Sequence, residues 1–300
     1  MKNLQKRKGI LIALLSLACA FIVAGSAIVI FTHISNNKNA SQEYDDEWTN
    51  NYGYRRYCMI YEIAKLRIQI ENRYAYTRSF CEAYLSADQT SPADICVSVT
   101  EEEMATEKKL SPNFSDGYIE NICIYRNICL QLPQKGRMLM HCSVLSYEGN
   151  AYAFLGRSGT GKSTHTRLWL KYLPSAKVIN GDKPILEYKD GQFIAYGTPW
   201  MGKEHWGENS QAPLKGLCFL EQAKVNAIRK LSVKEIPSRL FTQILLPQDE
   251  ENACATLELA DKMVTQVPAY LLQCDISEEA VQKSFEALTG LSFTEKKTIN

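Results

Sequence analysis

The chain has 300 residues, of which 45% are hydrophobic and 22% are charged, and its formal net charge is +1. This balance is that of a globular protein with a sizeable core, and without a basic stripe it gives no support for nucleic-acid binding. The 10 cysteines are scattered with no Cys-x-x-Cys pair, which indicates a reducing compartment and gives no zinc-ligand spacing.

The N-terminal segment has the pattern of a membrane anchor. Residues 10–31 are uncharged and apolar, and a membrane span needs ~20 such residues. A basic N-terminus, residues 1–9, precedes them, and a polar linker, residues 32–56, follows. A cleaved signal peptide is the alternative, but its apolar region normally has ~7–15 residues. We therefore predict that residues 10–31 form one uncleaved transmembrane helix, which anchors the protein in the membrane.

The folded part is predicted to cover residues 57–292, with a short tail at 293–300. Its first section, residues 57–137, has an α+β pattern, in which Thr100 and Ser115 are the predicted N-caps of two helices. The predicted elements of this section are a strand pair over 59–71, a short helix over 76–85, a strand over 94–100, and helices over 101–110 and 116–132.

The second section, residues 138–292, mixes hairpins with strand–loop–helix units, which favours an α/β fold with a mixed β-sheet. Its predicted elements are two strands within 137–156 joined by a turn at 148–150, a strand over 176–181, a hairpin over 184–197 turning at Asp190-Gly191, a strand over 214–222, helices over 234–246 and 249–267, a strand over 269–275 and a helix over 277–290.

A phosphate-binding motif lies near the middle of the chain. Residues 156–164 read GRSGTGKST and match G-x-x-x-x-G-K-[ST], a loop whose backbone N–H groups converge on an anion at the start of a helix. An apolar run typical of a buried strand precedes the motif, and residues 166–173 have the apolar spacing of a helix. The alternative interpretation of the motif is a flexible turn between a strand and an unrelated helix. The predicted ATP-binding residues are Gly156, Arg157, Ser158, Gly159, Thr160, Gly161, Lys162, Ser163 and Thr164.

Phosphoryl transfer also needs a carboxylate near the metal. Asp182 is the candidate, because it follows the apolar run that ends the next strand; the alternative is a turn residue that starts the hairpin. Lys162 is predicted to reach the outer phosphates, and Ser163 and Asp182 are predicted to hold Mg²⁺. The stretch NGDK is only superficially like the guanine-reading N-K-x-D, and no LSGGQ-like signature occurs, so a GTPase and an ABC-type ATPase are disfavoured.

The segments LMHCSV, GNAYAFLGRSGTGKSTHTRLWL and VINGDKPIL resemble the catalytic domain of HPr kinase/phosphorylase, which shares a P-loop fold with ATP-dependent phosphoenolpyruvate carboxykinase. The resemblance is strong over residues 139–186 and loose over 59–290. It implies a mixed-sheet nucleotide-binding domain that transfers phosphate from ATP with Mg²⁺. It also implies a role for His141, which stands where the family has a histidine on the strand before the loop.

The chain departs from this family at one carboxylate. The family's Asp-Asp pair is Gly181-Asp182 here, so either Asp182 serves both as base and as metal ligand, or the base comes from elsewhere. The phosphorylase half of the bifunctional activity is therefore in doubt. His141 either contacts the phosphates or helps a proton leave, and the alternative is a histidine satisfied in the core.

Residues 196–209, YGTPWMGKEHWGEN, stand in place of the family's own downstream signature. One interpretation is a loop that faces the P-loop, in which Lys203 stabilises the transferred charge and Glu204 or His205 takes a proton. The other is a surface loop with aromatic anchors. Arg157 either contacts a phosphate or faces water, and His165 is expected to pack inside its helix.

Two functions stay open. The first is an ATP-dependent, Mg²⁺-requiring kinase that acts on a hydroxyl of a protein or a small metabolite. The second is a membrane-anchored ATP-binding sensor without phosphotransfer, which the missing carboxylate suits. A decarboxylating carboxykinase ranks last, because the arginine and histidine ligands of an oxaloacetate pocket are not found. The sequence leaves the acceptor and a homo-oligomer open.

Localisation signals in the sequence conflict. The basic N-terminus should stay in the cytoplasm, which would place everything after residue 31 outside. ATP and the free cysteines point to the cytoplasm instead. We expect a membrane-anchored protein whose kinase-like domain is cytoplasmic, and the alternative is a soluble cytoplasmic form that starts at Met59.

Overall fold

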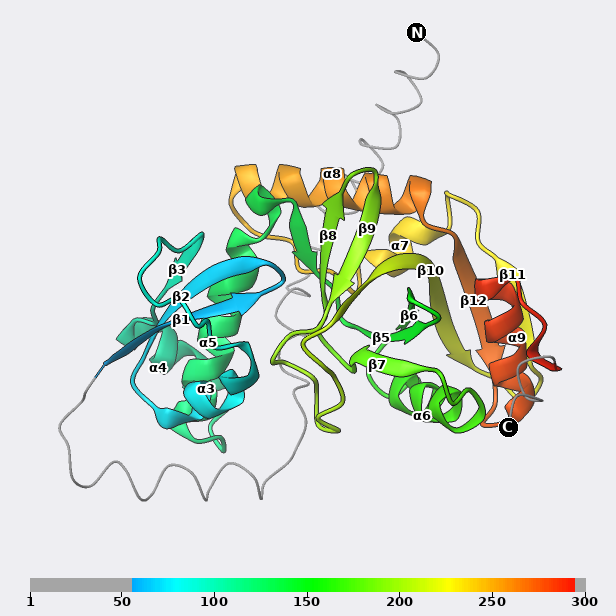
Figure 1. Cartoon of the computed structure of the whole chain (residues 1–300), viewed down its shortest axis with the longest axis horizontal. Coiled ribbons are helices and arrows are strands. Elements are labelled where there is room, and N and C mark those ends of the chain that lie inside the picture. The colour runs from blue at the N-terminus through cyan, green and yellow to red at the C-terminus, as the bar shows by residue number, and fades with distance from the viewer. Residues whose placement is uncertain (1–55, 295–300) are drawn as a thin grey trace, which may run out of the picture.

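The computed structural model describes residues 56–294, whose strands form two β-sheets (Figure 1). The smaller sheet has the order β1-β2-β3, with an antiparallel pair and a parallel pair. Ala64 and Lys65 turn between β1 and β2 with positive φ angles, as a two-residue hairpin requires. The elements of this section are β1 (Tyr57–Ile63), β2 (Leu66–Asn72), α3 (Ala75–Phe80), η1 (Glu82–Tyr84), β3 (Ile95–Val97), α4 (Glu101–Leu110), α5 (Asp116–Gln131) and η2 (Pro133–Lys135).

Both predicted helix caps in this section are confirmed. The Thr100 side chain accepts from the Glu103 backbone N–H, and the Glu103 carboxylate accepts from the Thr100 N–H, which is a reciprocal capping box. The Ser115 hydroxyl accepts from the Tyr118 N–H at the start of α5. Local sequence therefore determines where these two helices begin.

The larger sheet has nine strands in the described residues and mixes parallel with antiparallel pairs, as predicted. Its path runs β4-β8-β9-β10-β6-β5-β7, and β12 and β11 continue from β10. Strand β10 joins its two halves, because residues 211–213 pair with β9 and later residues pair in parallel with β6 and β12. The strands are β4 (Arg137–Leu139), β5 (Cys142–Tyr147), β6 (Asn150–Leu155), β7 (Lys177–Asn180), β8 (Ile185–Lys189), β9 (Gln192–Tyr196), β10 (Gln211–Gln222), β11 (Ala227–Lys230) and β12 (Ala269–Cys274).

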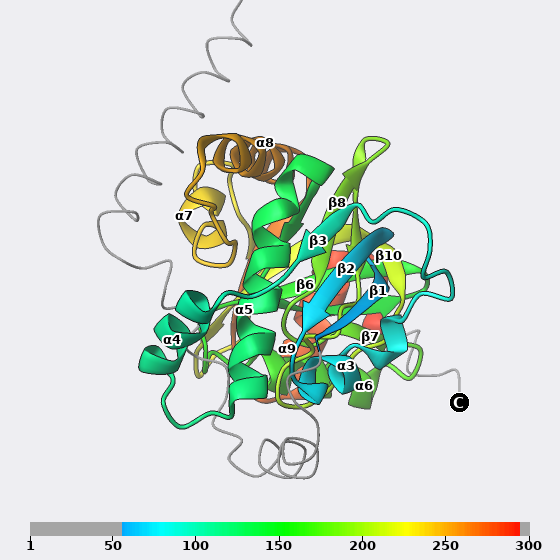
Figure 2. The same cartoon turned by 90° about the vertical axis from the view of Figure 1, so that its left-hand side faces the viewer.

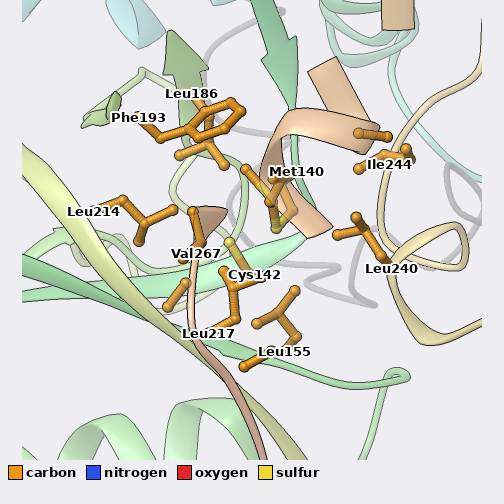
Figure 3. Packing of buried hydrophobic residues seen from close by; sticks show 14 of the residues in the cluster. Met140, Cys142, Leu155, Leu186, Phe193, Leu214, Leu217, Leu240, Ile244 and Val267 are labelled. Carbon is orange, nitrogen blue, oxygen red and sulfur yellow. The ribbon is translucent and has the colours of Figure 1, made fainter. Parts of the chain in front are cut away.

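Helices cover both faces of this sheet, because its central strands are apolar on both sides. In β6, Ala153 and Leu155 face the cluster beneath α8 (Glu250–Gln266), whereas Tyr152 and Phe154 face α6 (Lys162–Tyr172) and α9 (Glu278–Thr289). Figure 3 shows the first cluster, with Leu155 beside Leu217 and Cys142. Because both faces of β6 are covered, its apolar residues follow one another without a break instead of alternating with polar ones.

A third cluster of buried side chains joins the two sheets. Leu139, Ile185, Tyr196 and Trp200 from the larger section pack with residues of β1–β3 and α5. Figure 2 looks onto this end of the molecule, where the small sheet and α5 lie in front of the large sheet. The first section is thereby fixed against β4, β8, β9 and the loop that follows β9.

Several predicted boundaries were wrong. Residues 137–155 form three strands rather than two, because the chain changes pairing partner between β4 and β5. The helix predicted over 234–246 is a five-residue helix, α7 (Ile236–Leu240), and β11 was not predicted. By contrast, the helix of the phosphate-binding motif begins at the motif itself, at Lys162, and includes His165, as expected.

The predicted membrane anchor, residues 10–31, lies outside the described residues. Within residues 56–294, none of the helices is both long and apolar enough to span a bilayer.

Candidate active site

The phosphate-binding motif lies between β6 and α6, the arrangement that the sequence predicted. Gly161, the residue before α6, has a φ angle of +103°, which residues other than glycine rarely adopt. No side chain caps this end of the helix. The first N–H groups of α6 are therefore not capped by a side chain and can bind an anion. Lys162 is buried, and its Nζ donates to the Gly156 carbonyl at 2.9 Å across the loop.

Two side chains fix the tip of the motif. The Thr160 hydroxyl donates to the Arg157 carbonyl at 2.8 Å, and Nε2 of Gln222 donates to the Gly159 carbonyl at 3.0 Å. Arg157 and Ser158 are exposed. The role of Gln222 was missed in the sequence, although it is the last residue of β10, which runs parallel to β6 and ends at the same edge of the sheet.

A buried asparagine builds the turn that presents Asp182. The side-chain oxygen Oδ1 of Asn180 accepts hydrogen bonds from the backbone N–H groups of Asp182 (2.9 Å) and Lys183 (2.7 Å). Its amide donates to the Thr198 hydroxyl at 3.0 Å, and that hydroxyl donates to the Lys183 carbonyl at 2.8 Å. The pattern Asn-Gly-Asp is a turn signal that was available in the sequence.

Both carboxylate oxygens of Asp182 are engaged. Oδ1 lies 3.2 Å from Nε2 of His141, and Oδ2 forms an ion pair with Nζ of Lys183. Backbone pairing brings these residues together, because the Cys142 N–H donates to the Asp182 carbonyl at 3.0 Å. The structure therefore places His141 and Asp182 in contact, and it adds Lys183, which the sequence analysis did not single out.

The charges at this site interact strongly because the groups are buried. Burial alone raises the pKa of Asp182, but the ammonium of Lys183 and the hydrogen bond with His141 outweigh it and hold that pKa well below its usual range. Burial lowers the pKa of His141, and the positive charge of Lys162 lowers it further, against the opposing effect of Asp182. Burial also lowers the pKa of Lys162. At neutral pH, Asp182 is ionised and His141 is neutral.

The loop of residues 197–209 lies against the Asp182 turn. The Gly181 N–H donates to the Trp206 carbonyl at 2.8 Å. A Cβ on Gly202 would lie 2.9 Å from the Cβ of Asp182, so only glycine allows the loop to approach this closely. The guanidinium of Arg167 on α6 lies 5.5 Å from the Trp206 ring centroid. This loop thus connects the helix of the motif with the turn that carries Asp182.

The polar side chains of this loop that were predicted to take part in chemistry are exposed or pair with each other. Lys203 is 63% exposed at its side chain, and its ion-pair partner is Glu204 at 3.9 Å. His205 is exposed. Among the described residues, no hydrogen bond or ion pair joins these three side chains to Asp182, His141 or Lys162. The role assigned to Lys203 stays a prediction.

The residues present fit a divalent cation that is shared with a phosphate. Ser163 and Asp182 offer hydroxyl and carboxylate oxygens, the ligand type that Mg²⁺ prefers, and Asp182 is ionised. The described residues contain no group of three or more histidine, cysteine or carboxylate side chains placed to hold a metal. A cation here would therefore depend on the nucleotide for most of its ligands.

The known proteins that this chain resembles match it over only part of its length. No protein-family model matches the chain. The solved structure of the Hpr(Ser) kinase/phosphatase from Coxiella burnetii covers 41% of this chain and 93% of its own, with 13% identity and a TM-score of 0.23. A phosphoenolpyruvate carboxykinase (ATP) from Rhizobium rhizogenes (strain K84 / ATCC BAA-868) is 31% identical over 113 residues. That match covers 37% of this chain and spans only 16% of the carboxykinase. Together with the motif between β6 and α6, this similarity supports a P-loop, kinase-like α/β fold at family level.

Proposed function

We propose that this protein is an ATP-dependent phosphotransferase that requires a divalent metal and acts on a hydroxyl group of a protein or a small metabolite. The observation that carries the proposal is the meeting of two parts at one edge of the sheet. Cys142 pairs with Leu155, the residue before the phosphate-binding loop, and its N–H donates to the Asp182 carbonyl. The carboxylate–histidine pair, Asp182 and His141, therefore lies beside the loop that carries Lys162. The use of ATP by the similar carboxykinase, as its name states, supports the choice of nucleotide.

Each residue of the loop has a defined task in this proposal. The backbone N–H groups of residues 156–164 and the start of α6 bind the phosphates, and Lys162 moves from the Gly156 carbonyl to an outer phosphate. Ser163 and Asp182 would hold the metal, for which Mg²⁺ is the proposed ion. When bound, the metal neutralises the charge that develops on the transferred phosphoryl group.

His141 is the proposed proton acceptor. Asp182 is a weak base, because its pKa is depressed and both of its oxygens are engaged. His141 is neutral, and the proton on its Nε2 is directed to Oδ1 of Asp182. This tautomer leaves Nδ1 to take the proton of the acceptor hydroxyl, while Asp182 stabilises the imidazolium that forms. Asp182 alone can thus orient the base through Oδ1 and bind a cation through Oδ2. The two tasks therefore do not require a second carboxylate at position 181, where this chain has glycine.

A non-catalytic ATP sensor is the second candidate function. The observation that favours it is Gly181, which stands where the family that the sequence resembles has the first carboxylate of its Asp-Asp pair. In that case ATP binds at the same residues and no phosphoryl group is transferred.

The test combines binding with turnover. Titration with Mg-ATP should give saturable binding that Lys162→Ala weakens by ~10–100-fold, since a charge-assisted hydrogen bond to phosphate is lost. Incubation of the wild type with labelled ATP and a panel of proteins and hydroxyl-bearing metabolites should transfer label, and Asp182→Asn should abolish the transfer. Binding without transfer would favour the sensor, and undiminished affinity of Lys162→Ala for ATP would refute nucleotide binding at this loop.

A further inference from the structure

Lys162 is not the only buried lysine at this site. Lys183 is 7% exposed and its ammonium pairs with Oδ2 of Asp182. Its backbone is fixed on both sides, because its N–H donates to the Asn180 side chain and its carbonyl accepts from Thr198. A solvated surface lysine has none of these constraints. A buried lysine ammonium is therefore held in a fixed position beside Asp182, the candidate metal-binding carboxylate.

The turn that carries Lys183 lies beside the phosphate-binding loop, because the Asp182 carbonyl accepts from Cys142 and Cys142 pairs with Leu155, the residue before the loop. Lys183 lowers the pKa of Lys162, and both lysines lower the pKa of His141, so the three side chains share one electrostatic environment. With a neutral His141, the two lysines and Asp182 carry a net charge of about +1 at neutral pH. A site with that charge attracts a phosphate even before a metal is present.

We propose that Lys183 is a second phosphate-binding lysine, which Asp182 holds in place until ATP arrives. On binding, the ammonium of Lys183 passes from Oδ2 of Asp182 to a phosphate oxygen, and this frees Oδ2 for the divalent cation. The four-carbon stem of lysine permits such a movement while the backbone stays fixed. Lys183 thus serves as an internal counter-cation for the carboxylate and prevents an unpaired buried charge in the nucleotide-free protein. This inference rests on the proposed function, because it requires ATP at the loop.

The test exploits two effects of opposite sign. Lys183→Met should weaken the binding of ATP in the presence of EDTA by ~10–100-fold, because one charged phosphate contact is lost and Asp182 then repels the nucleotide. The same variant should bind Mn²⁺ without nucleotide ~10-fold or more tightly than the wild type, because Asp182 is released. Isothermal titration calorimetry gives the first value, and electron paramagnetic resonance of free Mn²⁺ gives the second.

The control is Lys189→Met, which removes an exposed lysine from β8 and should change neither affinity. Lys183→Gln provides a second neutral variant that keeps a hydrogen-bond donor for Asp182, in case the methionine prevents folding. Unchanged ATP and Mn²⁺ affinities would overturn the role of Lys183. A loss of ATP affinity without a gain in Mn²⁺ affinity would overturn it as well, since damage to the fold lowers both. If the wild type fails to bind Mg-ATP, the proposed function fails first.

Discussion

Single residues at the site show how burial and charge divide the chemistry between neighbours. Asp182 and His141 are in contact, and the pKa of each is lowered for a different reason. The ammonium of Lys183 and the hydrogen bond with His141 lower the pKa of Asp182, whereas burial lowers the pKa of His141. The carboxylate stays charged and the imidazole stays neutral. A neutral imidazole whose Nε2 is oriented by a carboxylate is the arrangement that general-base catalysis requires.

The pH dependence of the proposed reaction follows from this arrangement. The proposed base, His141, must be neutral, and its pKa in the folded protein lies below the ordinary value of about 6.5. Activity should therefore stay constant from pH 8 down to about 6.5 and fall only as the pH drops further and His141 gains a proton. His141→Gln should lower kcat by ~10²–10⁴-fold and leave the affinity for ATP unchanged. The measurement is a pH profile of kcat for both proteins; a residual profile in the variant with the same acid limb would assign that limb to another group.

At the scale of elements, a serine joins the helix of the motif, α6, to α9. The Ser284 hydroxyl on α9 lies 2.9 Å from the Trp169 Nε1 donor and 3.0 Å from Nε2 of His165, both on α6. It donates its own proton to the Val281 carbonyl at 2.9 Å. Burial lowers the pKa of His165 to about 4, so this histidine is a neutral packing residue, as expected from the sequence.

Loss of this serine should destabilise the protein. In Ser284→Ala the Trp169 and His165 donors remain buried without an acceptor, which costs about 2 kcal/mol or more of the free energy of unfolding. Chemical denaturation measures the loss. Lys283→Ala, which removes a solvent-exposed ion pair with Glu279 on the same helix, should cost much less. Equal losses in the two variants would mean that the serine contributes no more than a surface contact.

At the scale of the whole molecule, one arginine connects the two sheets. Arg137 on β4 is buried, its Nε donates to the Ala64 carbonyl in the β1–β2 turn at 2.9 Å, and its Nη2 lies 2.8 Å from Oε1 of Glu187 on β8. The Tyr196 hydroxyl donates to the other oxygen of Glu187 at 2.5 Å. The network fixes the small sheet against β4, β8 and β9, and β8 is the strand that follows the Asp182 turn.

The double variant separates the charge from the packing of this network. Arg137→Met should cost about 3–5 kcal/mol, because the Glu187 carboxylate then remains buried without a counter-charge. Arg137→Met/Glu187→Gln should recover at least about half of that loss, since the amide is neutral and still accepts from Tyr196. Thermal and chemical unfolding of the three proteins test this. If the second substitution recovers nothing, the loss arises from the contacts of Arg137 with the small sheet instead.

The sequence by itself determined the local features of this protein. The phosphate-binding motif, the caps at Thr100 and Ser115, and the β8–β9 turn at Asp190-Gly191 each depend on residues that lie close together in the chain. Backbone conformation and the first hydrogen bonds of a helix are set by such neighbours, so pattern is sufficient to predict them.

Only the tertiary structure decided which side chains share the site. Lys183 follows Asp182 directly, but nothing in the sequence says that its ammonium turns back to the carboxylate rather than to water. Gln222 reaches the motif from 63 residues away, and β10 changes partners along its length. These contacts depend on the register of non-local strands and on burial, which strengthens each charge interaction, and neither quantity can be read from residues that are adjacent in the chain.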